Sequence, residues 1–389
     1  MVRDITPQIK YIGVDDADLD LFESQYPVPN GMAYNSYVIL DEKIAIMDTA
    51  DARKADDWKA NLKEALAGRD ADYLVVHHME PDHSALILYT MEQYPSMKVV
   101  CSDKALKMLG NFFEGVDFPS RVITVKEGDQ LSLGTHNLTF HNAVMVHWPE
   151  VIVSYESTEK VLFSADAFGK FGVIDVEEDW TDEARRYYYN VCGKYGPQVR
   201  RLLKTISNLD VRTICSAHGP ILTDNIEKYV SLYDKWSGYE SESEGVLVAH
   251  ASIHGGTRKV AEIFAELLRQ KGAKEVVLAD LTRCDQSQVL SEAFRLSRCV
   301  LAAASYDTSV FPPMYDFLHH LSLKGWQNRR VGIIENGTWA PSAAKVMCMK
   351  LENMKEIEIV DPKVTIWSSI KTHDMDALNE LADAVLAEQ

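Results

Sequence analysis

The later part of the chain alternates between short apolar runs and longer stretches with helical spacing. Residues 257–272 carry apolar side chains three and four positions apart, which predicts a helix that stops at Gly272. Five apolar runs predict strands at residues 246–250, 276–280, 299–304, 331–335 and 363–367. Short strands separated by helices predict an open, five-stranded parallel sheet with helices on both faces.

The first 240 residues have a different pattern, with strand-like runs that come in pairs. Residues 36–40 and 44–48 flank the segment DEK at 41–43, which predicts a hairpin turn. Further runs lie at residues 73–77, 98–101, 121–125, 138–141, 151–155 and 161–164, and helical segments at 56–67 and 84–94. This order predicts an α+β fold of the αββα type, in which two sheets lie between layers of helices.

The clearest boundary is the polar, acidic segment SGYESESEG at residues 237–245. It separates a helical segment at 225–236 from the strand predicted at 246–250. A chain of 389 residues is also too long for one ordinary domain. We therefore expect two domains, residues 1–243 and residues 244–389.

The formal net charge of −18 speaks against nucleic acid or an anionic membrane surface as the main partner, because both require basic patches. The N-terminal segment has no apolar core of the signal-peptide kind, and no run is long enough for a membrane span. The six cysteines are dispersed without a CxxC pair, which excludes a rubredoxin or zinc-ribbon module in this chain. Dispersed thiols favour a cytoplasmic location.

The segment HHMEPDHS, residues 77–84, holds the densest group of chemically active side chains. It follows the strand predicted at 73–77, where a loop is free of helix and strand periodicity and its side chains can converge. The candidate ligands are His78, Glu80, Asp82 and His83. Histidines mixed with carboxylates suit Fe, Mn or Zn. We expect His77 to point the other way, and Asp82 taken alone is equally a helix N-cap.

Three later positions have the same character, each placed just after an apolar strand. They are His147 in VMVHWPE, Asp166 in VLFSADAFG and His218 in RTICSAHGP. A lone histidine after a strand is more often a hydrogen-bonded structural residue. Seven such side chains at strand ends in one domain instead predict a metal site.

With these positions the sequence resembles the metallo-β-lactamase superfamily, whose motif HxHxDH is followed by a later His, Asp and His. Here Glu80 replaces the second histidine, and in this the chain resembles the flavodiiron proteins, also called A-type flavoproteins. The segments YNSYVI, HWPE, FSADAFG and EARRYYYN also follow in the order of that family. The family pairs a metallo-β-lactamase-like domain with a flavodoxin-like domain, and the chain resembles its minimal two-domain class.

The resemblance implies a non-haem di-iron site. One iron would be held by His78, Glu80 and His147, the other by Asp82, His83 and His218, with Asp166 as the bridge. Carboxylate ligands suit iron that cycles between Fe(II) and Fe(III), whereas an all-histidine zinc pair serves hydrolysis. The resemblance leaves open whether His78 is bound, because the corresponding histidine is a ligand in only some members.

The segment SIHGGT lies between the first strand and the first helix of the second domain. Its hydroxyls, its two glycines and the helix N-terminus form a cradle for an anion. No GK[ST] follows, so this is not a Walker loop, and it is not GxGxxG either. It resembles the flavodoxin phosphate loop, which implies FMN as a cofactor. The expected contacts are Ser252, Ile253, His254, Gly255, Gly256 and Thr257.

Two further loops, residues 304–314 and 335–343, follow the third and fourth predicted strands. In flavodoxin-like domains the corresponding loops grip the flavin ring, and Tyr306 and Trp339 are aromatic side chains that would stack on it or edge it. The expected contacts are Ser305, Tyr306, Asp307, Thr308, Asn336, Gly337, Thr338 and Trp339. Flavodiiron proteins often carry Pro–Thr where this chain has Tyr306 and Asp307.

The resemblance implies an oxidoreductase in which FMN relays electrons from an external donor to the di-iron site. The site would reduce O2 to water, NO to N2O, or both, and Tyr195 would donate a hydrogen bond to the bound substrate. The donor is a rubredoxin-like protein, a ferredoxin or a deazaflavin. The resemblance also implies a head-to-tail homodimer or a homotetramer, which brings the flavin of one subunit to the irons of another.

Two other classes of function stay open at this point. One is a di-zinc hydrolase of the metallo-β-lactamase superfamily joined to an electron-transfer flavodoxin domain, against which Glu80 argues. The other is a flavin-based electron carrier whose metal site is only structural.

Overall fold

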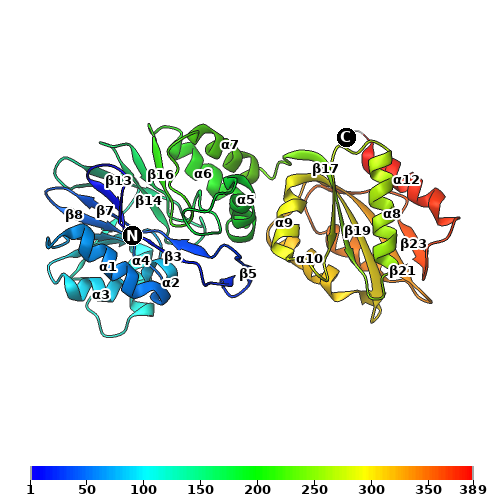
Figure 1. The fold of residues 1–389 in the computed structure, drawn as a ribbon, viewed down its shortest axis with the longest axis horizontal. Coiled ribbons are helices and arrows are strands. Elements are labelled where there is room, and N and C mark those ends of the chain that lie inside the picture. The colour runs from blue at the N-terminus through cyan, green and yellow to red at the C-terminus, as the bar shows by residue number, and fades with distance from the viewer. Residues whose placement is uncertain (1, 388–389) are drawn as a thin grey trace. The chain divides into compact units, whose positions relative to one another are not determined.

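The computed structural model describes residues 2–387 and divides into two compact units, Met1–Asp234 and Lys235–Gln389 (Figure 1). The division falls inside helix α7 (Ile226–Ser237), and strand β17 (Ser243–Ala251) opens the sheet of the second unit. Each unit has its own sheets and its own hydrophobic core. Among the described residues no helix is both long and apolar enough to cross a membrane.

Two sheets form the centre of the first unit. In spatial order, the larger sheet contains β1 (Arg3–Asp4), β2 (Ile9–Tyr11), β7 (Tyr37–Leu40), β8 (Ile44–Met47), β9 (Tyr73–Val75), β10 (Lys98–Ser102) and β11 (Val122–Val125). The smaller sheet contains β12 (Gln130–Ser132), β13 (Asn137–Asn142), β14 (Ile152–Glu156), β15 (Val161–Phe163) and β16 (Thr213–Cys215). Two short hairpin-like pairs, β3 (Val14–Asp16) with β6 (Met32–Tyr34) and β4 (Leu21–Phe22) with β5 (Tyr26–Pro27), lie outside them.

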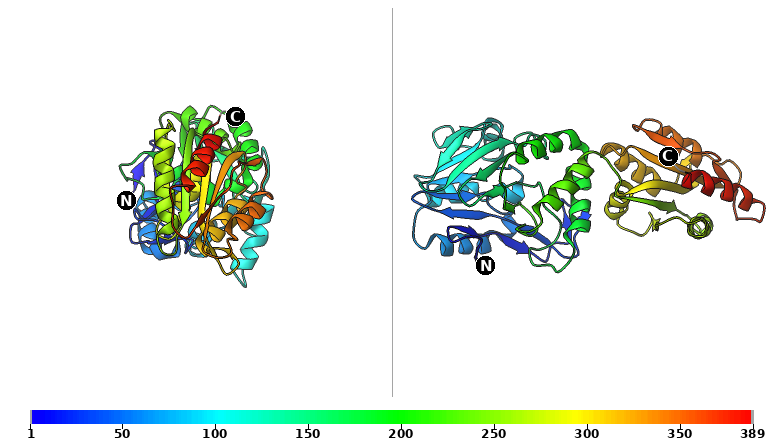
Figure 2. Two further views of the ribbon diagram at one scale, coloured as in Figure 1. Left: turned by 90° about the vertical axis from the view of Figure 1, so that its right-hand side faces the viewer. Right: turned by 90° about the horizontal axis from the view of Figure 1, so that it is seen from above.

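Helices cover the outer faces of both sheets (Figures 1 and 2). On the side of the larger sheet lie α1 (Ala55–Leu66), α3 (Ile87–Gln93) and α4 (Asp103–Phe112); on the other lie α5 (Trp180–Val191), α6 (Gly196–Ile206) and α7. Short helical turns complete the unit at η1 (Ala52–Lys54), α2 (Pro81–Ser84) and η2 (Gly193–Tyr195). The αββα prediction is confirmed.

The core of the first unit lies between its two sheets. Alternate residues of the larger sheet, such as Ile39 and Met47, face alternate residues of the smaller one, such as Phe140 and Phe163. Because strand side chains alternate between faces, each sheet keeps its second face for a helix layer. β7 and β8 pair through Leu40 and Ile44, which confirms the predicted DEK turn.

The second unit is a parallel sheet in the order β18 (Val276–Asp280), β17, β19 (Leu296–Tyr306) and β21 (Arg329–Gly337). The fifth strand is split into β22 (Ile357–Ile359) and β23 (Val364–Trp367), and both pieces pair with β21. Pro362 lies between them and has no N–H for the ladder, which explains the break. A short strand, β20 (Ser309–Val310), folds back onto β19.

Helices lie on both faces of this sheet, as predicted (Figure 1). One face is covered by α8 (Gly256–Gln270) and α12 (Asp374–Leu386), whose Phe264 and Leu381 pack with Val248 of β17. The remaining helices are α9 (Gln286–Arg295), α10 (Pro312–Leu323) and α11 (Ala343–Leu351). The loops that carry the predicted flavin contacts follow the carboxyl ends of β17, β19 and β21, where ligands bind in open parallel sheets.

Candidate functional site

Seven predicted ligands converge at one end of the paired sheets of the first unit. The strands β9, β15 and β16 end there, and six of the seven side chains follow them. His147 lies instead in the loop between β13 and β14, because residues 144–146 do not form the strand that the sequence predicted. The seven side chains form two groups. The first group is His78, Glu80, His147 and Asp166, and the second is Asp82, His83 and His218. Within each group, one ligand atom of every residue lies within 4.8 Å of the others. Each group is therefore compact enough to hold one metal ion.

The carboxylate of Asp166 stands between the two groups. Its Oδ2 lies 3.3 Å from His78 Nε2 and 3.2 Å from His147 Nε2. Its Oδ1 lies 3.3 Å from His83 Nε2 and 3.5 Å from His218 Nε2. One oxygen therefore faces each group, which is the arrangement of a bridging carboxylate.

The buried oxygens of the site fit a pair of cations. Both carboxylate oxygens of Asp82 and both of Asp166 are buried, and none of them accepts a hydrogen bond. A buried carboxylate without a donor or a cation is strongly destabilising. Asp82 lies inside α2, not at its N-cap, so the capping alternative for this residue is wrong. The chemistry of the donor set, three or four ligands per group with a carboxylate in each, fits iron, manganese or zinc.

Two of the predicted ligand histidines, His78 and His218, each make a hydrogen bond through Nδ1, which leaves Nε2 facing the metal groups. His218 Nδ1 donates to the carbonyl of Ala33 at 2.7 Å, and His78 Nδ1 lies 2.7 Å from Oε1 of the buried Glu150. Partners of this kind fix the orientation of metal-binding histidines and raise their basicity. His78 Nε2 consequently faces Glu80 at 3.2 Å, in position for a metal. Sequence analysis missed Glu150.

The charges of the site shift the pKa values of its members. Burial lowers the pKa of His78, but the charge of Asp166 and the hydrogen bonds of Glu150 and Glu80 outweigh it and raise that pKa to about 10. Burial also lowers the pKa of His147, but the hydrogen bonds and charges of Asp166 and Glu80 outweigh it and raise that pKa to about 10. For Glu80, burial raises the pKa, but His147 and His78 outweigh it and lower the value to about 2. Protons on these histidines thus balance the negative charge of the carboxylates, as a bound cation would.

The two groups differ in their access to solvent. The side chains of Glu80, His147 and Asp82 keep 17%, 10% and 9% of their surface exposed, whereas His83 and His218 keep 1%. The ring of Trp148 lies 5.1 Å from the ring of His78, edge to face, and 6.2 Å from that of His147. The most solvent-accessible part of the site is therefore at Glu80 and His147, with Trp148 beside them.

Two tyrosines differ in their relation to the metal groups. The ring of Tyr187, on α5, lies 5.6 Å from that of His218. Burial, followed by the charge of Asp166, raises the pKa of Tyr187 well above its usual value, and the charges of Asp82 and Glu80 add to the effect. The predicted Tyr195 lies in η2, partly exposed, and its ring has Lys194 above it at 5.9 Å. Sequence analysis missed Tyr187.

The predicted phosphate loop has the geometry of an anion cradle. The Gly255 N–H donates to Ser252 Oγ at 3.0 Å, and Gly255 has a φ of +87°, which favours glycine. α8 begins at Gly256 without a side-chain cap, which leaves its first N–H groups available to an anion. A Cβ at Gly256 would lie 3.0 Å from the carbonyl oxygen of Ser368. Ile253 and His254 are exposed and Thr257 is buried.

The ring loop after β21 is joined to the phosphate loop by a segment that sequence analysis missed. Ser368 accepts a hydrogen bond from Asn336 Nδ2 at 3.1 Å on its carbonyl, and its hydroxyl lies 3.1 Å from Thr338 Oγ1. Trp367 precedes it and pairs with Gly337. The segment after β23 therefore connects the loop after β21 to the phosphate loop.

The aromatic side chains of the ring loops are accessible to a planar ligand. Trp339 keeps 87% of its surface exposed and Tyr306 keeps 45%, with the Tyr306 ring edge to face on Phe311. Asp307 and Thr308 form the turn between β19 and β20. Ser305 Oγ accepts hydrogen bonds from Ser342 N and Ala343 N at the start of α11. The Ser305 hydroxyl can still donate its own hydrogen to a ligand.

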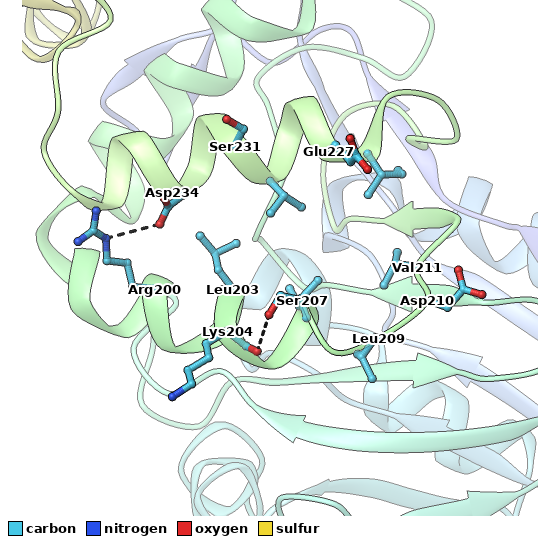
Figure 3. A pocket seen from close by; sticks show the side chains of 13 residues that line it. Arg200, Leu203, Lys204, Ser207, Leu209, Asp210, Val211, Glu227, Ser231 and Asp234 are labelled. Carbon is cyan, nitrogen blue, oxygen red and sulfur yellow. Dashed lines mark hydrogen bonds and ion pairs between the residues drawn. The ribbon is translucent and has the colours of Figure 1, made fainter.

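A separate surface groove of about 660 Å³ lies between α6 and α7 (Figure 3). Apolar side chains such as Leu203 and Val211 line it, and Arg200 Nε lies 3.7 Å from Asp234 Oδ1 at one end. None of the predicted metal or flavin contacts lines this groove.

Known proteins match the chain across both units. Residues 32–219 match the family described as ODP family beta lactamase. The chain is 27% identical over 327 residues to an uncharacterized protein from Methanocaldococcus jannaschii, which covers 82% of each chain. It is 25% identical over 359 residues to an anaerobic nitric oxide reductase flavorubredoxin from Escherichia coli, covering 89% of this chain and 74% of that protein.

Solved structures match nearly the whole chain. The rubredoxin oxygen:oxidoreductase from Desulfovibrio gigas superimposes with a TM-score of 0.93 at 25% identity, covering 99% of this chain and 98% of that one. The flavodiiron protein from Giardia intestinalis shares the fold, with a TM-score of 0.92 at 22% identity over 99% of this chain and 96% of that one. Fold and site define a two-domain protein, with a metallo-β-lactamase-like metal domain followed by a flavodoxin-like domain. In sequence and in fold the chain is similar to the flavodiiron proteins.

Proposed function

We propose that this protein is a flavodiiron oxidoreductase, in which FMN passes electrons from an external donor to a non-haem di-iron centre that reduces O2 to water, NO to N2O, or both. The observation that carries the proposal is the placement of Asp166, whose two oxygens face two ligand groups that each contain a further carboxylate. Mixed histidine and carboxylate ligands with a shared carboxylate suit a pair of irons that change oxidation state. The names of the relatives, an oxygen oxidoreductase and a nitric oxide reductase, support the two candidate substrates.

The residues of the first unit bind and shield the reacting centre. Two irons held here would supply electrons for the reduction of a diatomic molecule. His78, Glu80 and His147 would hold one, Asp82, His83 and His218 the other, and Asp166 both. Trp148 limits the entry of water beside the more exposed group. The Tyr187 hydroxyl, kept protonated by burial and by the nearby carboxylates, is available to donate a hydrogen bond to the substrate. Tyr195 stays a prediction for the same role.

The residues of the second unit would bind FMN. The loop Ser252 to Thr257 and the start of α8 supply backbone N–H groups for the phosphate. Trp339 and Tyr306, on loops at the same edge of the sheet, would flank the ring. Reduced flavin together with two ferrous ions stores four electrons, which is the number that O2 needs and twice the number that a pair of NO molecules needs.

The test is an anaerobic reoxidation experiment with the iron-loaded, FMN-containing protein. The protein is photoreduced, then mixed with O2 or NO, and the flavin and iron spectra are followed. Reoxidation by either gas, with N2O detected for NO, is the expected result. The zinc-substituted protein is the control, and its flavin should reoxidise far more slowly. If neither gas reoxidises the iron form faster than the zinc form, the proposal fails.

We further propose that the donor is a rubredoxin-like protein and that the active form is a homodimer or homotetramer with subunits arranged head to tail. A rubredoxin-like donor is supported by the names of two relatives, a rubredoxin oxygen:oxidoreductase and a flavorubredoxin, because the word rubredoxin occurs in both names. Steady-state turnover with a rubredoxin, a ferredoxin or a reduced deazaflavin identifies the donor. Light scattering after size-exclusion chromatography measures the assembly, and a fully active monomer would refute the second point.

A further inference from the structure

Three buried side chains form a hydrogen-bonded chain next to the metal segment, residues 77–83. His77 Nδ1 lies 2.6 Å from Oδ2 of Asp48, and His77 Nε2 lies 2.8 Å from Oγ of Ser154. Asp48 also accepts the backbone N–H of His77 at 2.7 Å on its other oxygen. None of the three residues exposes more than 7% of its surface. The chain joins the end of β8 to the start of the metal segment and to β14 of the other sheet.

The order Asp, His, Ser matches that of a nucleophilic triad, but its burial excludes this chemistry. A nucleophile must touch a substrate, and Ser154 lies inside the core at 0% exposure. The ring of His77 stacks on Phe163, 6.3 Å away, within the same core. The tautomer with Nδ1–H donates to Asp48 and lets Nε2 accept from Ser154, so both ring nitrogens are satisfied. These three hydrogen-bonded side chains therefore hold the backbone of the metal segment in place.

The residue after Asp48 holds the opposite end of the metal segment. The carbonyl of His83 accepts from Thr49 N at 2.9 Å and from Thr49 Oγ1 at 2.6 Å. Two consecutive residues at the end of β8 thus fix the first and last residues of a segment that carries four ligands. Asp48 itself has a φ of +56°, a conformation that aspartate tolerates better than most residues.

We propose that Asp48, Thr49 and Ser154 are positioning residues that hold residues 77–83 in their ligand-binding conformation before any metal is bound. The proposal rests on the proposed function only in taking this segment as the metal-binding one. The polar anchors at the two ends of the segment come from outside it, from the residues after β8 and from β14, and none of these three residues belongs to either ligand group. The arrangement needs no cation to satisfy its hydrogen bonds.

The test uses the full chain after its metal has been removed by a chelator. Hydrogen exchange is measured on peptides that cover residues 76–85, in the unaltered protein and in the variants Ser154→Ala, Asp48→Asn and Thr49→Val. Asparagine keeps the shape and tolerates the positive φ of position 48. Loss of one buried hydrogen bond should speed exchange in this segment by about fivefold. The same variants, reloaded with Zn(II), should release it to a chelator faster than the unaltered protein.

Tyr26→Phe is the control, because the buried Tyr26 hydroxyl donates to Asn190 O at 3.1 Å, a hydrogen bond between β5 and α5. It should leave both the exchange of residues 76–85 and metal release unchanged. Equal exchange in all variants, or faster exchange spread evenly over the first unit, would overturn the proposal. Because exchange is measured without metal or substrate, this outcome does not depend on whether the protein reduces O2 or NO.

Discussion

Glu150 Oε1 lies 2.7 Å from Nδ1 of His78, and both side chains are buried. The same oxygen accepts the backbone N–H of Met79 at 2.9 Å. Glu150 therefore fixes the ring of His78 with Nε2 turned toward Glu80 and Asp166. His78 is then oriented as a ligand by the protein itself, which bears directly on whether this residue binds a metal.

Replacing Glu150 by glutamine should weaken metal binding at the group that contains His78 by about tenfold, because outer partners of this kind set ligand orientation and basicity. Competition with a chromophoric chelator measures the affinity. Glu64→Gln, at an exposed position of α1, is the control and should bind metal normally. Unchanged affinity in Glu150→Gln would show that His78 does not contribute to binding.

Replacing Tyr187 by phenylalanine should lower kcat with O2 or NO by about tenfold, because a hydrogen bond to the bound substrate is lost. Iron and FMN contents should stay at the level of the unaltered protein. Tyr195→Phe is the comparison, since sequence alone favours Tyr195 while the ring contact with His218 favours Tyr187. A larger loss in Tyr195→Phe than in Tyr187→Phe would reverse the assignment.

Metal uptake by the metal-free protein should release protons. The pKa of His83 is raised to about 9, since the charges of Asp82 and Asp166 outweigh the lowering by burial, and those of His78 and His147 reach about 10. These histidines hold protons at pH 8, and a metal must displace them. Proton release measured in weakly buffered solution should fall toward zero as the pH rises through about 10. Release that is independent of pH would contradict these pKa values.

The same shifts set the pH dependence of stability in the metal-free protein. A histidine whose pKa is raised on folding, from about 6.5 in the unfolded chain, stabilises the fold fully below the unfolded value. That stabilisation is lost as the pH rises through 9 to 10. Thermal unfolding of the metal-free protein should therefore shift to lower temperature as the pH rises from about 6.5 to about 10. The metal-loaded protein should not show this decline, because its histidines are already deprotonated.

Replacing Gly256 by valine should reduce FMN retention without changing iron content. A Cβ at this position already lies 3.0 Å from the Ser368 carbonyl, so a branched side chain must push the phosphate loop and the segment after β23 apart. The flavin-to-protein ratio after gel filtration measures the loss. Gly272→Ala is a control in the same unit, because a Cβ there meets no atom within 4 Å, although its positive φ costs some stability.

The convergence of the ligand side chains could be predicted from sequence because most of them follow a short apolar strand, although His147 does not. Strand ends from both sheets meet at one edge of the first unit. Residues that come just after a strand, such as His78, Asp166 and His218, could therefore be placed together at that edge. The direction of His77 is likewise confirmed, because its ring bonds Asp48 and Ser154 in the core. Alternation of strand faces was sufficient for that prediction.

The supporting residues could not be predicted in the same way. Three tyrosines follow one another on α5, and only the packing of that helix decides that Tyr187 approaches His218. Glu150 contacts His78 across 72 residues of sequence, and Ser368 reaches the phosphate loop only because β23 lies next to β21. These contacts depend on how elements pack together, and a single sequence carries no direct signal for them.

The unequal exposure of the two ligand groups has a consequence for how the protein is prepared. The group with Glu80 and His147 is open enough for a bound ion to exchange with the medium, whereas Asp82, His83 and His218 are enclosed. Purification in the presence of chelators or foreign cations would therefore deplete or replace the two positions at different speeds. A sample with half its expected metal would then hold that metal mainly in the enclosed position, so the metal content has to be measured before its activity is judged.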